Sequence, residues 1–169
     1  DLNTLTCSAQ QMIAAVSSAG GFPAIALDSS GVPIIAYRDA TGVNYVRCAD
    51  AACSSNNPLS IPGFSNSSDH IEGYFKRAFS DGNTITFASY GVRNGAAQDL
   101  IRIVSCDAAC TNATTNTISV DAAGLFLDLA YNASGFPLLG GYDLRNDAPT
   151  LLSCDDATCT STTPIAVNA

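Results

Sequence analysis

The chain has no tryptophan, one histidine and few charged residues, and each of these shortages excludes a class of function. Of its 169 residues only 13% are charged, and the formal net charge is −8. Nucleic acids and anionic membranes attract clustered Lys and Arg, but only Lys76 and Arg77 are adjacent here. No apolar run approaches the roughly 20 residues of a membrane-spanning helix. We therefore expect no nucleic-acid partner and no membrane insertion.

Acid and base side chains are also too scarce for most enzymes. His70 lies in the polar segment NSSDHIEG, and the Gly-x-Ser-x-Gly motif of many hydrolases is absent. Glycosidases need two carboxylates in a cleft, but Glu72 is the only glutamate and most aspartates lie in turn-like segments. The Asp-box of sialidase propellers needs a tryptophan. We predict that the protein is not an enzyme and has no catalytic residues.

Cysteine, in contrast, is abundant, and six of the seven cysteines form three close pairs. The spacing of the pairs follows an internal repeat and only one histidine is present, so disulfides are favoured over a zinc site. We expect an oxidising compartment outside the cell. The predicted disulfides join Cys48 to Cys53, Cys106 to Cys110 and Cys154 to Cys159.

One unit recurs three times along the chain. Residues 31–53, 82–110 and 135–159 each contain a glycine turn, an apolar run with a tyrosine, a polar turn, a second apolar run and a cysteine pair. A period of about 40 to 50 residues with four strands per unit is typical of β-propeller blades. We predict one all-β repeat domain over 1–169, with units at 19–62, 70–121 and 122–169.

Each unit is predicted to contain four antiparallel strands, because short apolar runs alternate with turn residues. The first unit has runs at 21–27, 32–38, 43–48 and 59–61, the second at 74–79, 84–90, 100–106 and 116–120, and the third at 125–131, 136–142, 149–154 and 164–168.

Residues 1–18 form an extra N-terminal strand that is out of phase with the repeat. They resemble the segments that follow the second cysteine of each unit, so Cys7 is the second half of a pair whose first half is missing. A leftover cysteine in a secreted protein suggests an intermolecular bond, and Cys7 is the candidate. The chain opens at Asp1 without a Met, and we interpret it as a mature product after cleavage or as a fragment.

The repeat resembles a known family. Gly-x-Pro, a run ending in Tyr, and a Cys-Asp-Ala-x-Cys hairpin are similar to the disulfide-bearing β-propeller repeats of large secreted bacterial proteins. The second unit departs from this pattern, with Asn83 and Thr84 in place of x-Pro and a longer insert before Cys106. The resemblance implies a propeller-like fold and secretion from a bacterium, and it implies no catalytic residues.

Three blades cannot close a propeller, which needs at least four. The array is therefore open or is completed by oligomerisation, because unpaired edges are templates for association. Our first hypothesis is a secreted structural protein that self-assembles through its open blade edges into an oligomer or an extracellular filament. The alternative is a lectin-like module that binds glycans and closes its propeller by oligomerisation.

Two sets of residues are candidates for ligand sites. Sugars stack on aromatic rings and bind Arg, so one set is Tyr37, Tyr90 and Tyr142 with Arg38, Arg93 and Arg145, although blade packing is the competing role of the tyrosines. Aspartates in the cysteine hairpins either cap the hairpins or bind calcium, the one cofactor considered. These are Asp50, Asp107, Asp155 and Asp156.

Overall fold

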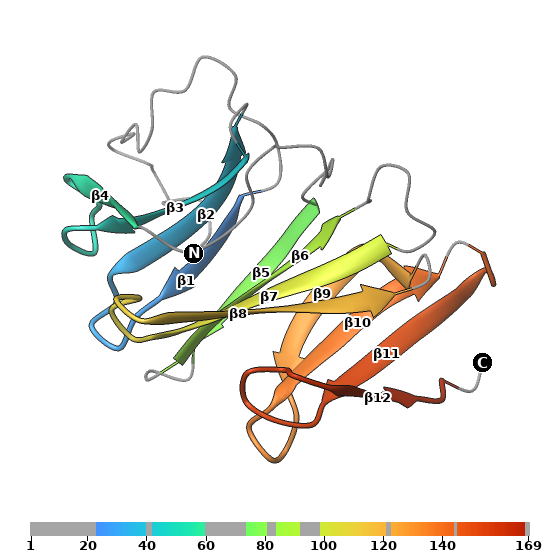
Figure 1. Cartoon of the computed structure of the whole chain (residues 1–169). Coiled ribbons are helices and arrows are strands. Elements are labelled where there is room, and N and C mark those ends of the chain that lie inside the picture. Colours follow the sequence, from blue (N-terminus) through green and yellow to red (C-terminus); the bar gives the residue numbers. More distant parts are fainter. Residues whose placement is uncertain are drawn as a thin grey trace, which may run out of the picture.

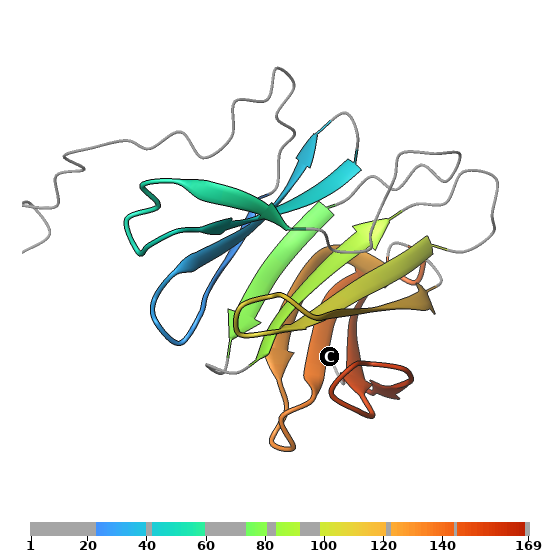
Figure 2. The ribbon, with the colours of Figure 1, turned by 60° about the vertical axis from the view of Figure 1, so that its left-hand side comes forward.

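The structure is a computed structural model, and it describes residues 23–39, 42–59, 74–80, 84–91, 99–120, 123–143 and 145–167. These residues form twelve strands and no helix, in three antiparallel sheets of four strands each. The all-β prediction with three four-stranded units is confirmed. Figures 1 and 2 show the three sheets in chain order, with the second between the other two.

In each sheet the strand order follows the chain, so neighbouring strands are joined by hairpins. The first sheet contains β1 (Ala24–Leu27), β2 (Pro33–Asp39), β3 (Gly42–Cys48) and β4 (Asn56–Leu59). The second contains β5 (Tyr74–Ser80), β6 (Thr84–Gly91), β7 (Asp99–Asp107) and β8 (Ala113–Val120). The third contains β9 (Ala123–Tyr131), β10 (Pro137–Asp143), β11 (Ala148–Cys154) and β12 (Thr162–Ile165).

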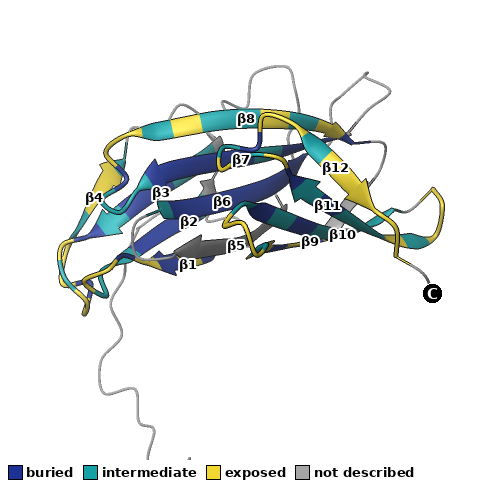
Figure 3. Ribbon diagram, turned by 90° about the horizontal axis from the view of Figure 1, so that it is seen from below, coloured by how far each residue is buried: buried dark blue, intermediate teal, exposed yellow. Residues whose placement is uncertain are grey.

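Every predicted strand overlaps an observed one, but the last strand of each sheet begins earlier than predicted. The strands β4, β8 and β12 begin three residues after the second cysteine of the preceding hairpin. A backbone hydrogen bond closes each hairpin just before that point, for example from the Ala49 amide to the Ser55 carbonyl at 2.8 Å. These outer strands are rich in polar residues, and nearly all of their residues are exposed or half-buried (Figure 3), so an apolar run marks their start poorly.

The first hairpin of the first and third sheets has the same turn chemistry. Asp28 and Asn132 each accept hydrogen bonds from two amides of the turn that follows, at 2.8 to 3.0 Å. Gly31 and Gly135 then adopt positive φ angles of 75° and 77°, which favour glycine. Asp28 is also paired with Arg47 at 2.6 Å, so the turn is tied to β3.

Among the described residues there are three disulfides, one in each sheet. They lie at the β3–β4 hairpin of the first sheet, the β7–β8 hairpin of the second and the β11–β12 hairpin of the third. They join the cysteine pairs predicted from the sequence, with Cα–Cα distances of 4.7 to 4.8 Å. All six of these cysteines are buried. Disulfides of this kind indicate an oxidising environment.

The sheets pack face to face through apolar side chains. Between the first and second sheets, Ile34 and Ala36 meet Ile85 and Phe87, and the Tyr45 ring lies edge-on to Phe87 at 5.2 Å. A second cluster joins the other side of the second sheet, the side away from the first sheet, to the third sheet. The first strands β1, β5 and β9 contact one another in turn, and β9 also contacts β6 and β7. The core therefore lies between sheets, as in stacked layers.

The predicted N-terminal strand at 1–18 and Cys7 lie outside the described residues. Within the described part of the chain, nothing forms a helix suited to crossing a membrane.

Candidate functional site

The disulfide hairpins use one aspartate each to hold the loop. Asp50, Asp107 and Asp156 stand three residues before the second cysteine, and the carbonyl of each accepts a hydrogen bond from the amide of that cysteine at 2.7 to 3.2 Å. Their carboxylates accept hydrogen bonds from the amide and hydroxyl of the residue after the cysteine. These residues are Ser54, Thr111 and Thr160.

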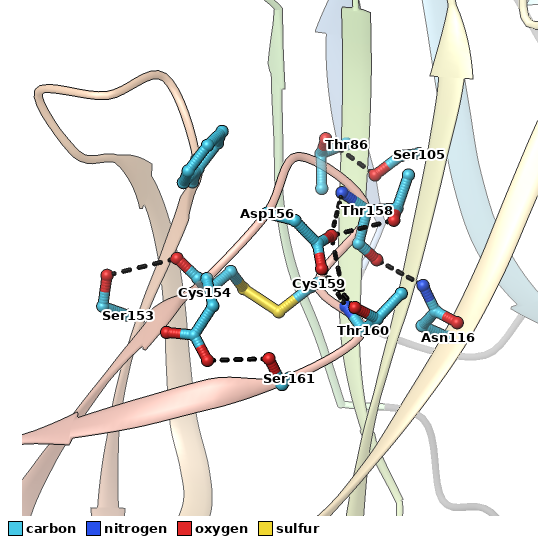
Figure 4. The surroundings of a disulfide bond; sticks show 12 residues. Thr86, Ser105, Asn116, Ser153, Cys154, Asp156, Thr158, Cys159, Thr160 and Ser161 are labelled. Atoms are coloured by element: carbon cyan, nitrogen blue, oxygen red, sulfur yellow. Dashed lines mark hydrogen bonds between the residues drawn. A yellow bond between two sulfur atoms is a disulfide. The ribbon is translucent and has the colours of Figure 1, made fainter.

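These hydrogen bonds favour the charged form of the carboxylates. Bonds from the Thr111 hydroxyl and amide, with those from Asn112, lower the pKa of Asp107 to about 2. Hydrogen bonds from the hydroxyls of Thr160 and Thr158, drawn in Figure 4, lower the pKa of Asp156 to about 2. Hydrogen bonds from Ser54 lower the pKa of Asp50. The three aspartates therefore cap the hairpins as anions.

Asp155 has a different position from the other three hairpin aspartates. Its carboxylate accepts hydrogen bonds from the Ser161 and Thr163 hydroxyls at 2.7 and 2.8 Å, across the hairpin. Among the described residues, no three His, Cys, Asp or Glu side chains are grouped so that they could hold a metal ion. Calcium binding at these aspartates stays a prediction, and capping is the role that their hydrogen bonds support.

The three candidate tyrosines do not occupy equivalent positions. Strand register can be counted from the first cysteine of each hairpin. Tyr90 pairs with Ile101 and Tyr142 with Pro149, each five residues before that cysteine, whereas Tyr37 pairs with Asn44, four residues before it. Because alternate residues of a strand face opposite sides, Tyr37 lies on the other face of its sheet.

The surroundings of the tyrosines differ accordingly. Tyr90 is only 3% exposed and belongs to the core between the second and third sheets. Tyr37 packs against Ile35 and Val46 on the far face of the first sheet. The Tyr142 hydroxyl donates to Asp147, and this bond raises the pKa of Tyr142. The three tyrosines therefore have non-equivalent surroundings, and ligand binding by them stays a prediction.

Of the three candidate arginines, only Arg145 has a described side chain. Arg145 is exposed in the β10–β11 turn, and its amide donates to Asp143 at 2.8 Å. Arg38 belongs to β2, but its side chain lies outside the described parts of the structure, and Arg93 lies outside the described residues.

A polar pocket of about 390 Å³ lies between the second sheet and the third disulfide hairpin. Asn116 of β8 bridges the two parts by donating to the Thr158 carbonyl at 2.5 Å (Figure 4). Six of the eight lining residues have polar side chains, although carbon atoms make up most of the exposed lining: Thr84, Ser105, Cys106, Asp107, Asn112, Thr114, Ala157 and Thr158. Two of them are predicted site residues: Asp107 is a candidate for calcium binding or capping, and Cys106 is a disulfide cysteine.

One side of the third sheet carries apolar residues that no described sheet covers. On the side turned away from the second sheet, register pairs Gly140 with both Asp128 and Leu151, and Leu138 with Ala130. We call these five residues the forward face of the third sheet. Asp128 and Ala130 are exposed and the other three are half-buried. Together with Leu129 they line a shallow pocket of about 160 Å³, and a Cβ at Gly140 would meet no atom within 4 Å.

The opposite end of the array also exposes apolar side chains. On the side of the first sheet turned away from the second, Ile25 pairs with Ile35, which pairs with Val46. We call Ile25, Leu27, Ile35 and Val46 the rear face of the first sheet. Ile35 and Val46 are buried against Cys48 and Cys53, but Ile25 and Leu27 on β1 are 57% and 53% exposed.

Comparison of the sequence with models of known protein families gave no match, and comparison with curated proteins gave none either.

Sequence reasoning missed both outer faces and the polar pocket as sites. The faces appear in the sequence only as ordinary apolar strand residues, so the sequence cannot show which of them a neighbouring sheet covers. The pocket could have been suspected from the Ser, Thr and Asn residues after each cysteine pair, such as TNATTN after Cys110.

Proposed function

We propose that the protein is a non-enzymatic, secreted structural protein whose sheets act as propeller-like blades and self-associate at the two open ends of the array into an oligomer or extracellular filament. The surfaces that we assign to this association are the uncovered faces of the end sheets, in place of the strand edges expected from the sequence. The observation that carries this proposal is the forward face of the third sheet. It presents Leu138 and Leu151 on one surface, and no described sheet packs on it. Exposed apolar surfaces of this kind mark interaction sites.

Magnitudes indicate what such an association needs. Fully burying an Ile or Leu side chain contributes roughly 1.5–3 kcal/mol, whereas association costs roughly 4–15 kcal/mol in lost freedom. Several side chains must therefore be buried together. The clusters between the sheets already bury this many within one chain, and the outer faces offer side chains of the same kind.

Secretion is supported by the disulfides, since these form and persist mainly in oxidising compartments. Cys7 is the proposed site of a covalent link between copies. To test the function, the native chain is measured by light scattering and negative-stain imaging, with and without reductant, beside Cys7→Ser. We expect oligomers or filaments of both proteins, with disulfide-linked chains lost from non-reducing gels only in the variant. Monomers at all concentrations would refute the proposal.

The second candidate is a lectin-like module, and the observation that favours it is the polar pocket at the junction of the second and third sheets. Hydroxyl, amide and carboxylate groups there match the hydrogen-bonding groups of a sugar, although no aromatic ring lines the pocket. Glycan binding by the native chain that is lost in Asn112→Ala, in the hairpin, and kept in Ser119→Ala, at an exposed position of β8, would favour this candidate.

A further inference from the structure

Each sheet has a forward face, turned toward the following sheet, and a rear face, turned toward the preceding one. In all three sheets the disulfide lies on the rear face: Cys106 packs against the first sheet and Cys154 against the second, while Cys48 packs beside Ile35 and Val46. Each internal interface therefore joins one forward face to one rear face. Of the two outer faces, that of the first sheet is a rear face and that of the third sheet is a forward face.

The forward face of the third sheet matches the forward face of the first position by position. Leu151 and Tyr45 each lie three residues before the first cysteine of their hairpin. Leu138 corresponds to Ile34, because each pairs with the residue directly before that cysteine. Ile34 is 0% exposed because the second sheet covers it, whereas Leu138 is half-buried. An aliphatic residue occupies both positions, although no described sheet covers the second.

The rear face of the first sheet matches the rear face of the third in the same way. Ile25 pairs with Ile35, and Leu129 pairs with Leu139. Ile35 and Leu139 each pair in turn with the residue two positions before the first cysteine of the hairpin, which is Val46 in the first sheet and Leu152 in the third. Leu129 is 3% exposed because it packs on the second sheet, whereas Ile25 is 57% exposed. The exposed side chains of the rear face are therefore those of β1.

The internal interfaces also show where β1 would sit on a third sheet. Leu129 packs in the cluster that contains Ala88 and Ile103 of the second sheet. By register, the counterparts of Ala88 and Ile103 in the third sheet are Gly140 and Leu151, and both line the shallow pocket on its forward face.

We propose that two copies of this chain associate head to tail, with β1 of one copy docked beside β9 of the other and its Ile25 seated in the pocket formed by Leu138, Gly140 and Leu151. This inference rests on the proposed self-association and names the surfaces that perform it. The contact repeats the geometry by which β9 already packs on β5 within the chain. Because the two surfaces differ, the association is heterologous and builds rings or filaments.

The test uses the full chain with one blocked face at a time. Ala130→Lys places a charge on the forward face of the third sheet, and Ile25→Lys places one on the rear face of the first. Both residues are exposed, so we expect both variants to fold. The matched control is Thr117→Lys, which adds the same side chain at an exposed position of β8. Urea midpoints confirm folding, and sedimentation velocity gives the mass.

We expect the association constant to fall at least tenfold in each blocked variant and to stay unchanged in Thr117→Lys. When the two blocked variants are mixed, we expect particles of two chains and none larger. The mixture restores one interface because each variant supplies the face that the other lacks. Monomers in the mixture, or loss in Ala130→Lys with none in Ile25→Lys, would overturn the head-to-tail contact. If both variants assemble as the native chain does, the inference fails and the proposed function stands; a monomeric native chain refutes the proposed function itself.

Discussion

The forward faces of the first and third sheets are built alike and differ in their surroundings. In the first sheet, Ala24, Ala26, Ile34 and Ala36 are buried against the second sheet. Their counterparts in the third sheet are Asp128, Ala130, Leu138 and Gly140, which are exposed or half-buried. From this difference we infer that the apolar residues of a forward face follow their position in the repeat, whether or not a described sheet covers that face.

One residue departs from that likeness. Asp128 carries a charge where the first sheet has Ala24, and its carboxylate accepts a hydrogen bond from the Leu129 amide at 2.9 Å. A charge at this place suits an exposed surface and opposes burial. The third sheet thus keeps an apolar face but limits how strongly it can be covered.

The largest effect should come from removing what all three sheets share. In the chain-entropy model each disulfide closes a short loop and stabilises the fold by about 2 kcal/mol, so reduction of all three costs about 6 kcal/mol. This is comparable with the whole stability of a small domain. We expect the chain to unfold in strong reductant at moderate temperature, as measured by circular dichroism; a melting temperature unchanged by complete reduction would contradict this.

Truncating equivalent residues on the two forward faces should give unequal losses. Ile34→Ala creates a cavity in a covered interface and should cost about 3 kcal/mol of unfolding free energy. Leu138→Ala, at the same position of the third sheet, should cost about 1 kcal/mol because the side chain is half exposed. Urea denaturation at low protein concentration measures both. Equal losses would show that the two faces are equally covered in the monomer.

Making the third sheet more like the first should strengthen self-association. Asp128→Ala installs the residue that the first sheet has at this position and removes a charge that association would bury. We expect the association constant to rise about tenfold, or roughly 1.4 kcal/mol. Sedimentation over a range of concentrations measures it, with Asp147→Ala, in the exposed β10–β11 turn, as the control. A weakened association in Asp128→Ala would mean that the carboxylate is itself a contact.

The smallest effect concerns the capping aspartates, which the three hairpins share. The folded-state pKa of Asp107 and Asp156 is about 2, below the ordinary value of 3.8. Their stabilisation is therefore complete above about pH 4 and is lost as the pH falls toward 2. We expect the urea midpoint to decline over this window, and less so in the double variant Asp107→Asn with Asp156→Asn. Parallel profiles would show that other groups cause the decline.

Much of the fold could be predicted from the sequence because its signals are local. Glycine turns, short apolar runs and close cysteine pairs each act within a few residues, and they located all twelve strands. The starts of β4, β8 and β12 were wrong because these outer strands carry polar residues that resemble loops.

The sites could be predicted less well because they depend on register and on packing between sheets. Tyr37, Tyr90 and Tyr142 look equivalent in the sequence, yet a one-residue difference in register places Tyr37 on the opposite face. In the same way, the sequence could not tell Ile25 from Leu129, since both are apolar strand residues and only the neighbouring sheet makes them differ.

The most direct test of self-association through open blade faces is the sedimentation of the native chain beside Ala130→Lys over a wide range of concentrations. We predict that the native chain grows beyond its 17.3 kDa monomer as concentration rises, while Ala130→Lys stays at that mass. A native chain that remains at 17.3 kDa throughout would contradict self-association. If the two proteins have the same concentration dependence, the chain still self-associates, but the forward face of the third sheet is not the surface that does so.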